Sequence, residues 1–143
     1  MVRSKGVWLV GAVGVAAAAL LWQASQAQVT KGKSRAAQTK FLMRGVNQPH
    51  CAALGKMLKA GPADDKAWEE AACHASILNE MSYVLMDDGR CPDANWAGAA
   101  KTLRECSAKL LQAIEAKNVD DARAAFKGLT GACAACHKAH KKS

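Results

Sequence analysis

The stretch DDARAAFKGLTGACAACHKAHKK, residues 120–142, decides how the rest of the chain is interpreted. It opens with two aspartates and closes with lysines, a charge order that favours a helix because it complements the helix dipole. Between the charged ends, small and apolar side chains recur every three or four residues at Ala122, Ala125, Phe126 and Leu129. The stretch therefore predicts a final helix that carries Cys133, Cys136 and His137 near its end.

Three further stretches, spanning residues 39–59, 64–89 and 92–118, have apolar side chains at helical spacing. Pro49 interrupts the first, because proline removes one helical hydrogen bond and crowds the carbonyl four residues back. That helix is expected to kink near Gly45 or to form two pieces. The chain is rich in alanine and poor in strand-forming residues. Four helices joined by short connections predict an all-α, antiparallel four-helix bundle with a C-terminal Cys-x-x-Cys-His site.

The N-terminal residues 1–27 have the pattern of a cleaved signal peptide. Arg3 and Lys5 precede an uncharged apolar run, and small residues at positions 24–27 suit a signal peptidase. Cleavage leaves residues 28–143 as one domain and lowers the formal charge from +8 to +6. We expect an exported, periplasmic protein without a membrane segment. The alternative is that the apolar run is retained as an anchor.

The Cys133-Ala134-Ala135-Cys136-His137 spacing is specific because the chemistry of covalent haem attachment fixes it. Two thiols must add to two vinyl groups on one porphyrin edge. On a helix, residues three and four apart share a face, so both thiols and the imidazole can meet one ring. The motif predicts one haem c, attached through Cys133 and Cys136, with His137 as an axial iron ligand.

The motif has three other interpretations. A zinc site requires a second ligand pair at similar spacing, and the sequence offers only Cys73-His74 and His140. A thioredoxin-like pair belongs at the start of a helix beside a strand, whereas this motif ends a helix. A structural Cys133–Cys136 disulfide is the third. Haem attachment is favoured because c-type haem is attached outside the cytoplasm, which agrees with export.

A four-helix bundle with Cys-x-x-Cys-His near the end of its last helix resembles the cytochrome c′ family and its low-spin, methionine-ligated relatives. Lys141 stands where that family often has a basic residue. The resemblance implies a mono-haem electron carrier, or alternatively a five-coordinate haem protein that binds NO or CO. It also implies a homodimer formed through the first two helices. Pro49 and the additional cysteines depart from the family pattern.

In an antiparallel bundle, the end of the fourth helix lies level with the start of the first. The residues at the level of the motif are expected to be Met43, Asn47, Met81, Leu85, Met86 and Trp96. By the resemblance and by this height, Met43 is the candidate distal iron ligand; its alternative role is core packing. His50 lies about 10 Å deeper, and His140 is expected at the surface.

Four cysteines remain outside the motif, an even number that suits disulfides in an exported chain. Cys51 and Cys73 are symmetric about the turn at residue 62, so we expect them to pair. Cys106 is an alternative partner for Cys73, and a bond between Cys91 and Cys106 requires the loop to fold back. Buried free thiols are the remaining possibility.

Basic residues gather at both segments that meet at the motif end: Lys31, Lys33, Arg35, Lys40, Arg44, Lys138, Lys141 and Lys142. They predict attraction of acidic redox partner proteins, although helix-end solvation also explains them. Nucleic acid does not fit an exported haem protein. We expect no enzyme and no catalytic residue, because only His50 or Asn47 offers a distal acid–base group.

Overall fold

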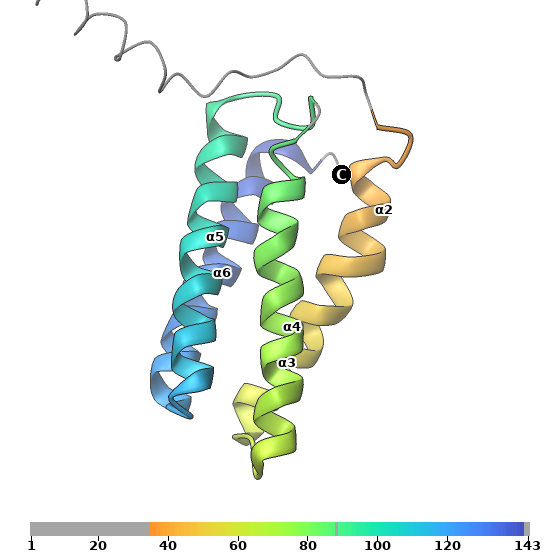
Figure 1. Ribbon diagram of the computed structural model, residues 1–143. Helices are drawn as coiled ribbons and strands as arrows, with labels where there is room; N and C mark the ends of the chain where they lie inside the picture. Colours follow the sequence, from red (N-terminus) through yellow and green to blue (C-terminus); the bar gives the residue numbers. More distant parts are fainter. Residues whose placement is uncertain (1–34, 88, 142–143) are drawn as a thin grey trace, which may run out of the picture.

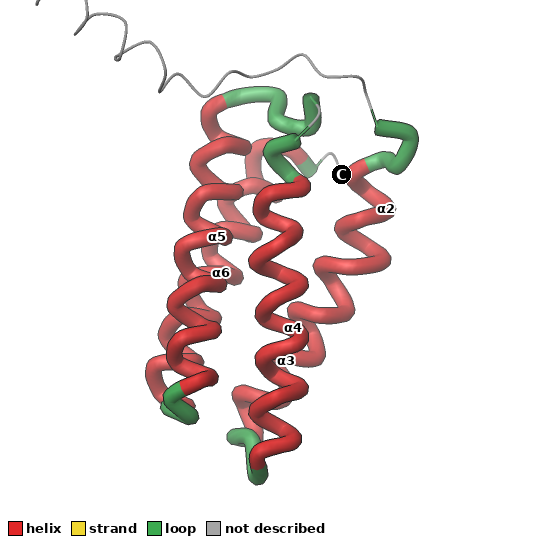
Figure 2. The backbone as a smooth tube through the Cα atoms, in the orientation of Figure 1, coloured by secondary structure: helices red, strands yellow, loops and turns green. Residues whose placement is uncertain are grey.

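The computed structural model describes residues 35–87 and 89–141, so the predicted signal peptide lies outside the described residues. The elements are α2 (Thr39–Leu42), η2 (Met43–Asn47), α3 (Gln48–Ala60), α4 (Asp65–Val84), α5 (Ala94–Glu115) and α6 (Val119–His140). Short turns join successive helices, which run alternately up and down (Figure 1). Within the described ranges every regular element is helical (Figure 2). The all-α, antiparallel four-helix architecture is therefore confirmed.

The first helix of the bundle is divided into α2, η2 and α3, as its proline predicts. Residues 43–47 form a π-helical turn that contains Gly45, and Pro49 occupies the first turn of α3. Pro49 has no N–H with which to reach the carbonyl of Gly45, so the wider turn absorbs the missing bond. The first helix bends at this irregular turn, which begins at Met43 and ends at Asn47 (Figure 1).

Side-chain caps fix where the other helices begin. Asp64 accepts a hydrogen bond from the backbone N–H of Ala67 at 2.8 Å, and Asp93 accepts one from Trp96 at 2.9 Å. Asn118 caps α6 by accepting from the N–H groups of Asp120 and Asp121 at 3.2 and 3.1 Å. Each cap satisfies amide donors that lack an intrahelical partner. The predicted starts are accurate to within two residues.

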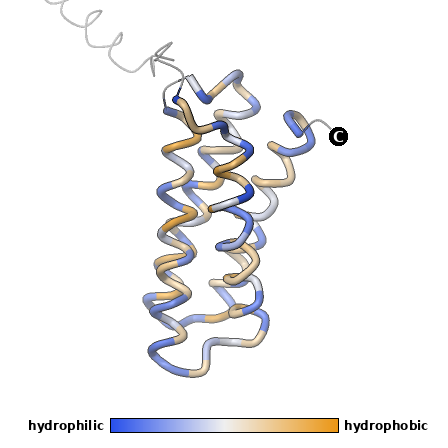
Figure 3. Tube along the Cα trace, turned by 90° about the vertical axis from the view of Figure 1, so that its right-hand side faces the viewer, coloured by the Kyte–Doolittle hydropathy of each residue, from blue (hydrophilic) through white to orange (hydrophobic). Residues whose placement is uncertain are grey.

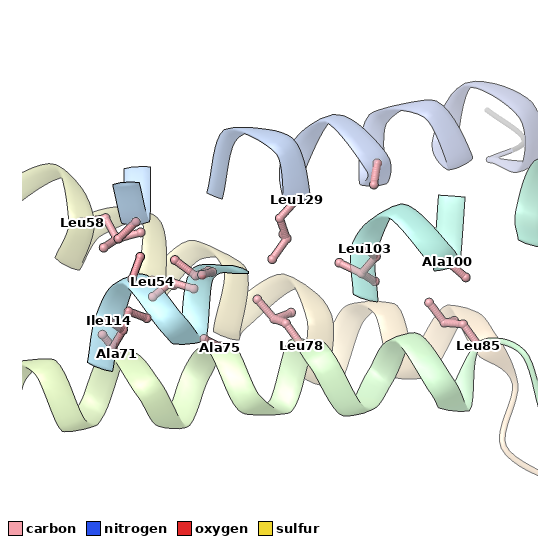
Figure 4. Close-up of a cluster of buried hydrophobic side chains, with 14 residues drawn as sticks. Leu54, Leu58, Ala71, Ala75, Leu78, Leu85, Ala100, Leu103, Ile114 and Leu129 are labelled. Atoms are coloured by element: carbon pink, nitrogen blue, oxygen red, sulfur yellow. The ribbon is translucent and has the colours of Figure 1, made fainter. Parts of the chain in front are cut away.

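The helices enclose one apolar core made mainly of leucine and alanine. Figure 4 shows these side chains pointing between the helices, from Leu58 and Ile114 at one end to Leu85 and Ala100 at the other. Orange apolar positions alternate with blue polar ones along each helix in Figure 3, as expected when one stripe of a helix is buried. Across the described ranges, no helix combines the length and apolar character needed to cross a membrane.

Arg123 closes the ring of helices at the end opposite the motif. Its Nε donates to the carbonyl of Leu58 at 2.8 Å, and its Nη2 donates to that of Lys59 at 3.3 Å. Both carbonyls belong to the last turn of α3, where the helix itself supplies no donor. α3 and α6, the first and last parts of the bundle, are therefore joined at this end.

Candidate functional site

The Cys-x-x-Cys-His motif lies in the last two turns of α6, next to the start of α5. Cys133 and Cys136 are half-buried, and His137 is exposed. Residues three and four apart lie on one face of a helix, so the two thiols and the imidazole occupy adjoining positions on α6. Cys133 packs against the core, Cys136 is half-buried one turn later, and the imidazole of His137 is exposed beside them.

Cys133 lies against the core and near Cys51 of α3. Both cysteines pack on the same cluster of buried side chains. Desolvation by burial raises the pKa of Cys133 to about 11, and the neighbouring Cys51 and Cys136 thiolates add to this shift. Burial likewise raises the pKa of Cys51. These thiols are therefore neutral at pH 7 and lack the thiolate character of a reactive redox cysteine.

A polar corner surrounds the second motif cysteine where α5 begins. Desolvation raises the pKa of Cys136, and the negative charge of Asp93 raises it further. His140 packs edge-on against Trp96, with ring centroids 5.3 Å apart, and its Nε2 lies 3.4 Å from Asp93 Oδ1. That last contact becomes an ion pair when the imidazole is protonated, but it is too poorly directed to be a hydrogen bond. His140 was predicted at the surface, and its side chain is half-buried there, 20% exposed.

The bend in the first helix places Met43 and Asn47 at this same end of the bundle. Met43 is half-buried against the core. η2 packs on α4, but no Cα of α2 or η2 lies within 8 Å of a Cα of α6. The first helix thus diverges from α6 at the motif and meets it again through α3 (Figure 1). Arg90 Nη1 holds the start of α2 by donating to Thr39 Oγ1 at 3.1 Å.

Asn47 carries a buried polar atom without a partner. Its side chain is 8% exposed, and its Oδ1 accepts no hydrogen bond. Leaving a buried acceptor unpaired costs about 1–3 kcal/mol, so such atoms mark places that a further group completes. Asn47 is at the level where the sequence predicts the haem. The divergent first helix, this orphaned atom and the half-buried thiols of Cys133 and Cys136 fit a prosthetic group at this end of the bundle.

The histidine and cysteine pairs differ from the sequence expectation. All six cysteines are free, so the expected Cys51–Cys73 bond is not formed. Instead His50 and His74, which are also symmetric about residue 62, meet with their Nδ1 atoms 2.8 Å apart. Consecutive residues on a helix point about 100° apart, so only one of the two symmetric pairs can face inward. Cys51 therefore faces α6, and Cys73 is exposed.

A shallow groove of about 650 Å³ runs between α5 and α6 on another face of the bundle. Its lining is mostly glycine and alanine, with Asn95, Thr102 and Lys138 as the larger side chains. None of Cys133, Cys136 and His137 lines it. The groove lies on the side of α6 that bears Ala135 of the motif rather than its cysteines.

In comparisons with known proteins, no family model, no curated protein and no solved structure matches this chain. The resemblance to cytochrome c′ consequently remains a prediction from the motif and its place in the helix order. The helical bundle, in contrast, is shown by the structure.

Proposed function

We propose that the chain is an exported mono-haem c-type cytochrome that acts in periplasmic electron transfer. The observation that carries the proposal is the position of the motif: two half-buried thiols, of which Cys133 packs on the core, lie beside His137 near the end of α6. Cys133 and Cys136 would hold the haem through thioethers, and His137 would bind its iron. When bound, such a haem supplies one-electron redox chemistry at a potential set by its axial ligands and surroundings.

The surroundings of the motif support this assignment over a redox-active dithiol. A raised pKa keeps Cys133 and Cys136 as neutral thiols, whereas a disulfide exchange enzyme needs a low-pKa thiolate. The indole of Trp96, the half-buried Met43 and the core below would exclude water from one side of the ring. A low-dielectric setting of that kind suits a redox centre that exchanges electrons without chemistry on a substrate.

The first test is whether haem stays on the chain after denaturation. The protein is produced in a host that matures exported c-type cytochromes, and haem is detected on a denaturing gel. We expect a haem-stained band for the natural sequence and for Cys73→Ser, and none for the Cys133→Ser/Cys136→Ser variant. A natural protein without gel-stable haem would reject the proposal.

Met43 is the candidate for the sixth ligand, and spectra decide its role. Ligation by Met43 predicts a low-spin spectrum with a methionine–iron charge-transfer band and no CO binding. Met43→Leu would then give a high-spin, CO-binding protein, whereas Met86→Leu at the same end would not. The thioether would raise the reduction potential, as suits electron transfer.

The alternative function is binding of NO or CO at a five-coordinate haem. One observation favours it: α2 and η2 diverge from α6, which places the helix bearing Met43 away from His137. A natural protein with a high-spin spectrum that shifts readily with CO would select this alternative. Met43→Leu would then leave the spectrum unchanged.

The proposed partners are acidic redox proteins that meet the motif end. Exposed cations from both ends of the chain surround that end: Arg35, Lys40, Arg44, Lys138 and Lys141. Complementary charge speeds association of oppositely charged proteins. Dimer formation and export from a 1–27 signal peptide belong to the same proposal, and sedimentation and N-terminal sequencing of the mature protein test them.

A further inference from the structure

The two histidines on the α3–α4 face have a geometry that the haem assignment does not use. Their Nδ1 atoms lie 2.8 Å apart and their ring centroids 5.0 Å apart, and both side chains are half-buried. A carboxylate accompanies them: Glu70 Oε1 lies 4.0 Å from the other ring nitrogen of His74, one turn earlier on α4. We propose that His50 and His74 form a binding site for a single divalent transition metal, Cu²⁺ being the preferred ion.

The proposed site assigns one tautomer to each histidine. Glu70 favours the proton of His74 on Nε2, so the Nδ1 of His74 presents a lone pair toward His50. Without metal, His50 donates its Nδ1 proton to that lone pair across the 2.8 Å contact. When a metal binds, the proton of His50 moves to its own Nε2 and both Nδ1 lone pairs coordinate the ion. Protons and charge balance without any further reactant.

The two nitrogens are close enough to occupy adjacent positions on one metal ion. Metal–nitrogen bonds of about 2.0–2.1 Å at right angles place their nitrogens about 2.9 Å apart, whereas tetrahedral bonds of the same length place them about 3.3 Å apart. The 2.8 Å separation of the metal-free hydrogen bond is close to the first of these values, so the rings need move little to occupy adjacent positions in the square-planar coordination of Cu²⁺. Copper also stands highest in the affinity order of divalent ions for such donors.

The remaining coordination positions fall to water. Within residues 35–87 and 89–141, no group of three or more His, Cys, Asp or Glu side chains is arranged to hold a metal ion. A carboxylate hydrogen-bonded behind a metal-bound imidazole often supports such a ligand, and Glu70, now 4.0 Å from His74 Nε2, would take that role by moving closer. Because His50 and His74 belong to different helices, the metal would link α3 to α4 and stabilise the folded state.

Copper titration of the purified full-length protein tests the site, using calorimetry and thermal unfolding. All variants are made in the Cys73→Ser protein, which lacks the exposed thiol beside His74. Cys73→Ser alone is the matched control. We expect one equivalent of Cu²⁺ to bind, to raise the unfolding temperature, and to bind more weakly to His50→Gln and His74→Gln by at least tenfold. Glu70→Gln should weaken binding by a smaller factor, and Zn²⁺ should bind less tightly than Cu²⁺.

Folding of each variant is checked by its unfolding temperature without metal. Unchanged Cu²⁺ affinity in folded His50→Gln and His74→Gln would overturn the proposal, because the ion would then bind elsewhere. The proposal would also be overturned if the Cys73→Ser protein showed no saturable one-to-one binding of Cu²⁺. The Cys133→Ser/Cys136→Ser change is added to every protein in the titration, so that the motif thiols do not compete for Cu²⁺ and the outcome is independent of haem attachment.

Discussion

The indole Nε1 of Trp96 reaches across the α4–α5 connection and donates a 2.6 Å hydrogen bond to the carbonyl oxygen of Leu85. Leu85 is the C-cap of α4, which ends at Val84, so its carbonyl has no donor within the helix. α4 consequently stops at Val84 rather than continuing to the predicted end at Gly89. Trp96, in the first turn of α5, therefore contacts two other helices. Its indole N–H bonds the C-cap of α4, and its ring packs on His140 of α6.

Trp96→Phe is expected to destabilise the protein by about 1–2 kcal/mol, because the buried carbonyl of Leu85 loses its donor. Phenylalanine keeps an aromatic ring against His140, so packing with α6 is largely retained. Urea unfolding followed by circular dichroism measures the change. The control is Trp68→Phe, which lies at the other end of the bundle; a larger loss there than at Trp96 would contradict this explanation.

Gly128 lets α6 approach α5 closely, because a Cβ at this position would lie 2.8 Å from the Sγ of Cys106. A Cβ on Gly131, one turn later, would meet no atom within 4 Å. Alanine in a helix is favoured over glycine by about 1 kcal/mol. Gly131→Ala should therefore raise the free energy of unfolding, whereas Gly128→Ala should lower it by about 1 kcal/mol through overpacking.

A double variant separates steric from backbone effects at Gly128. Gly128→Ala combined with Cys106→Ala removes the Sγ that the new methyl would meet. The double variant should have a higher unfolding temperature than Cys106→Ala alone. Equal losses for Gly128→Ala in both backgrounds would mean that the close approach to Cys106 is not the cause.

The helices were predictable because each carries its own local signals. Apolar spacing, an aspartate before α4 and α5, and Pro49 in the first helix are all properties of short segments. The end of α4 was not predictable in the same way. It depends on a hydrogen bond from Trp96 to Leu85, eleven residues away, that exists only after the two helices have packed.

The pairings between helices were predicted only in part. Symmetry about the turn at residue 62 applies equally to Cys51–Cys73 and to His50–His74, and the choice depends on the rotation of each helix. The π-helical turn at residues 43–47 shifts that rotation, and no local pattern gives its size. The same symmetry, applied to histidine, would have brought His50 and His74 together at the sequence level.

Cys133 gives the haem-free protein a stability that falls in alkali. Its pKa is raised to about 11 from an ordinary value of 9.0, so the folded state retains a proton that the unfolded state releases. The free energy of unfolding therefore decreases as pH rises from about 9 to about 11. Urea titrations across this range should show the decrease, and Cys133→Ala should remove much of it.

Covalent attachment of haem changes that expectation, since a thioether sulfur does not titrate. The decrease between pH 9 and 11 should be smaller in protein whose Cys133 carries haem. An equally steep decrease in both forms would show that other groups cause it. Cys51→Ser should lower the pKa of Cys133, because it removes a neighbouring thiolate.

Electron exchange at the motif end should respond to the exposed cations there. We expect Lys138→Gln/Lys141→Gln to slow oxidation of the reduced protein by anionic ferricyanide several-fold at low salt, and to speed oxidation by a cationic cobalt complex. At about 0.5 M salt both effects should vanish, since the screening length falls below about 5 Å. Lys59→Gln/Lys66→Gln, at the opposite end, provides the control with the same net charge. Equal effects from both pairs would show that net charge, rather than the position of these lysines, governs the rate.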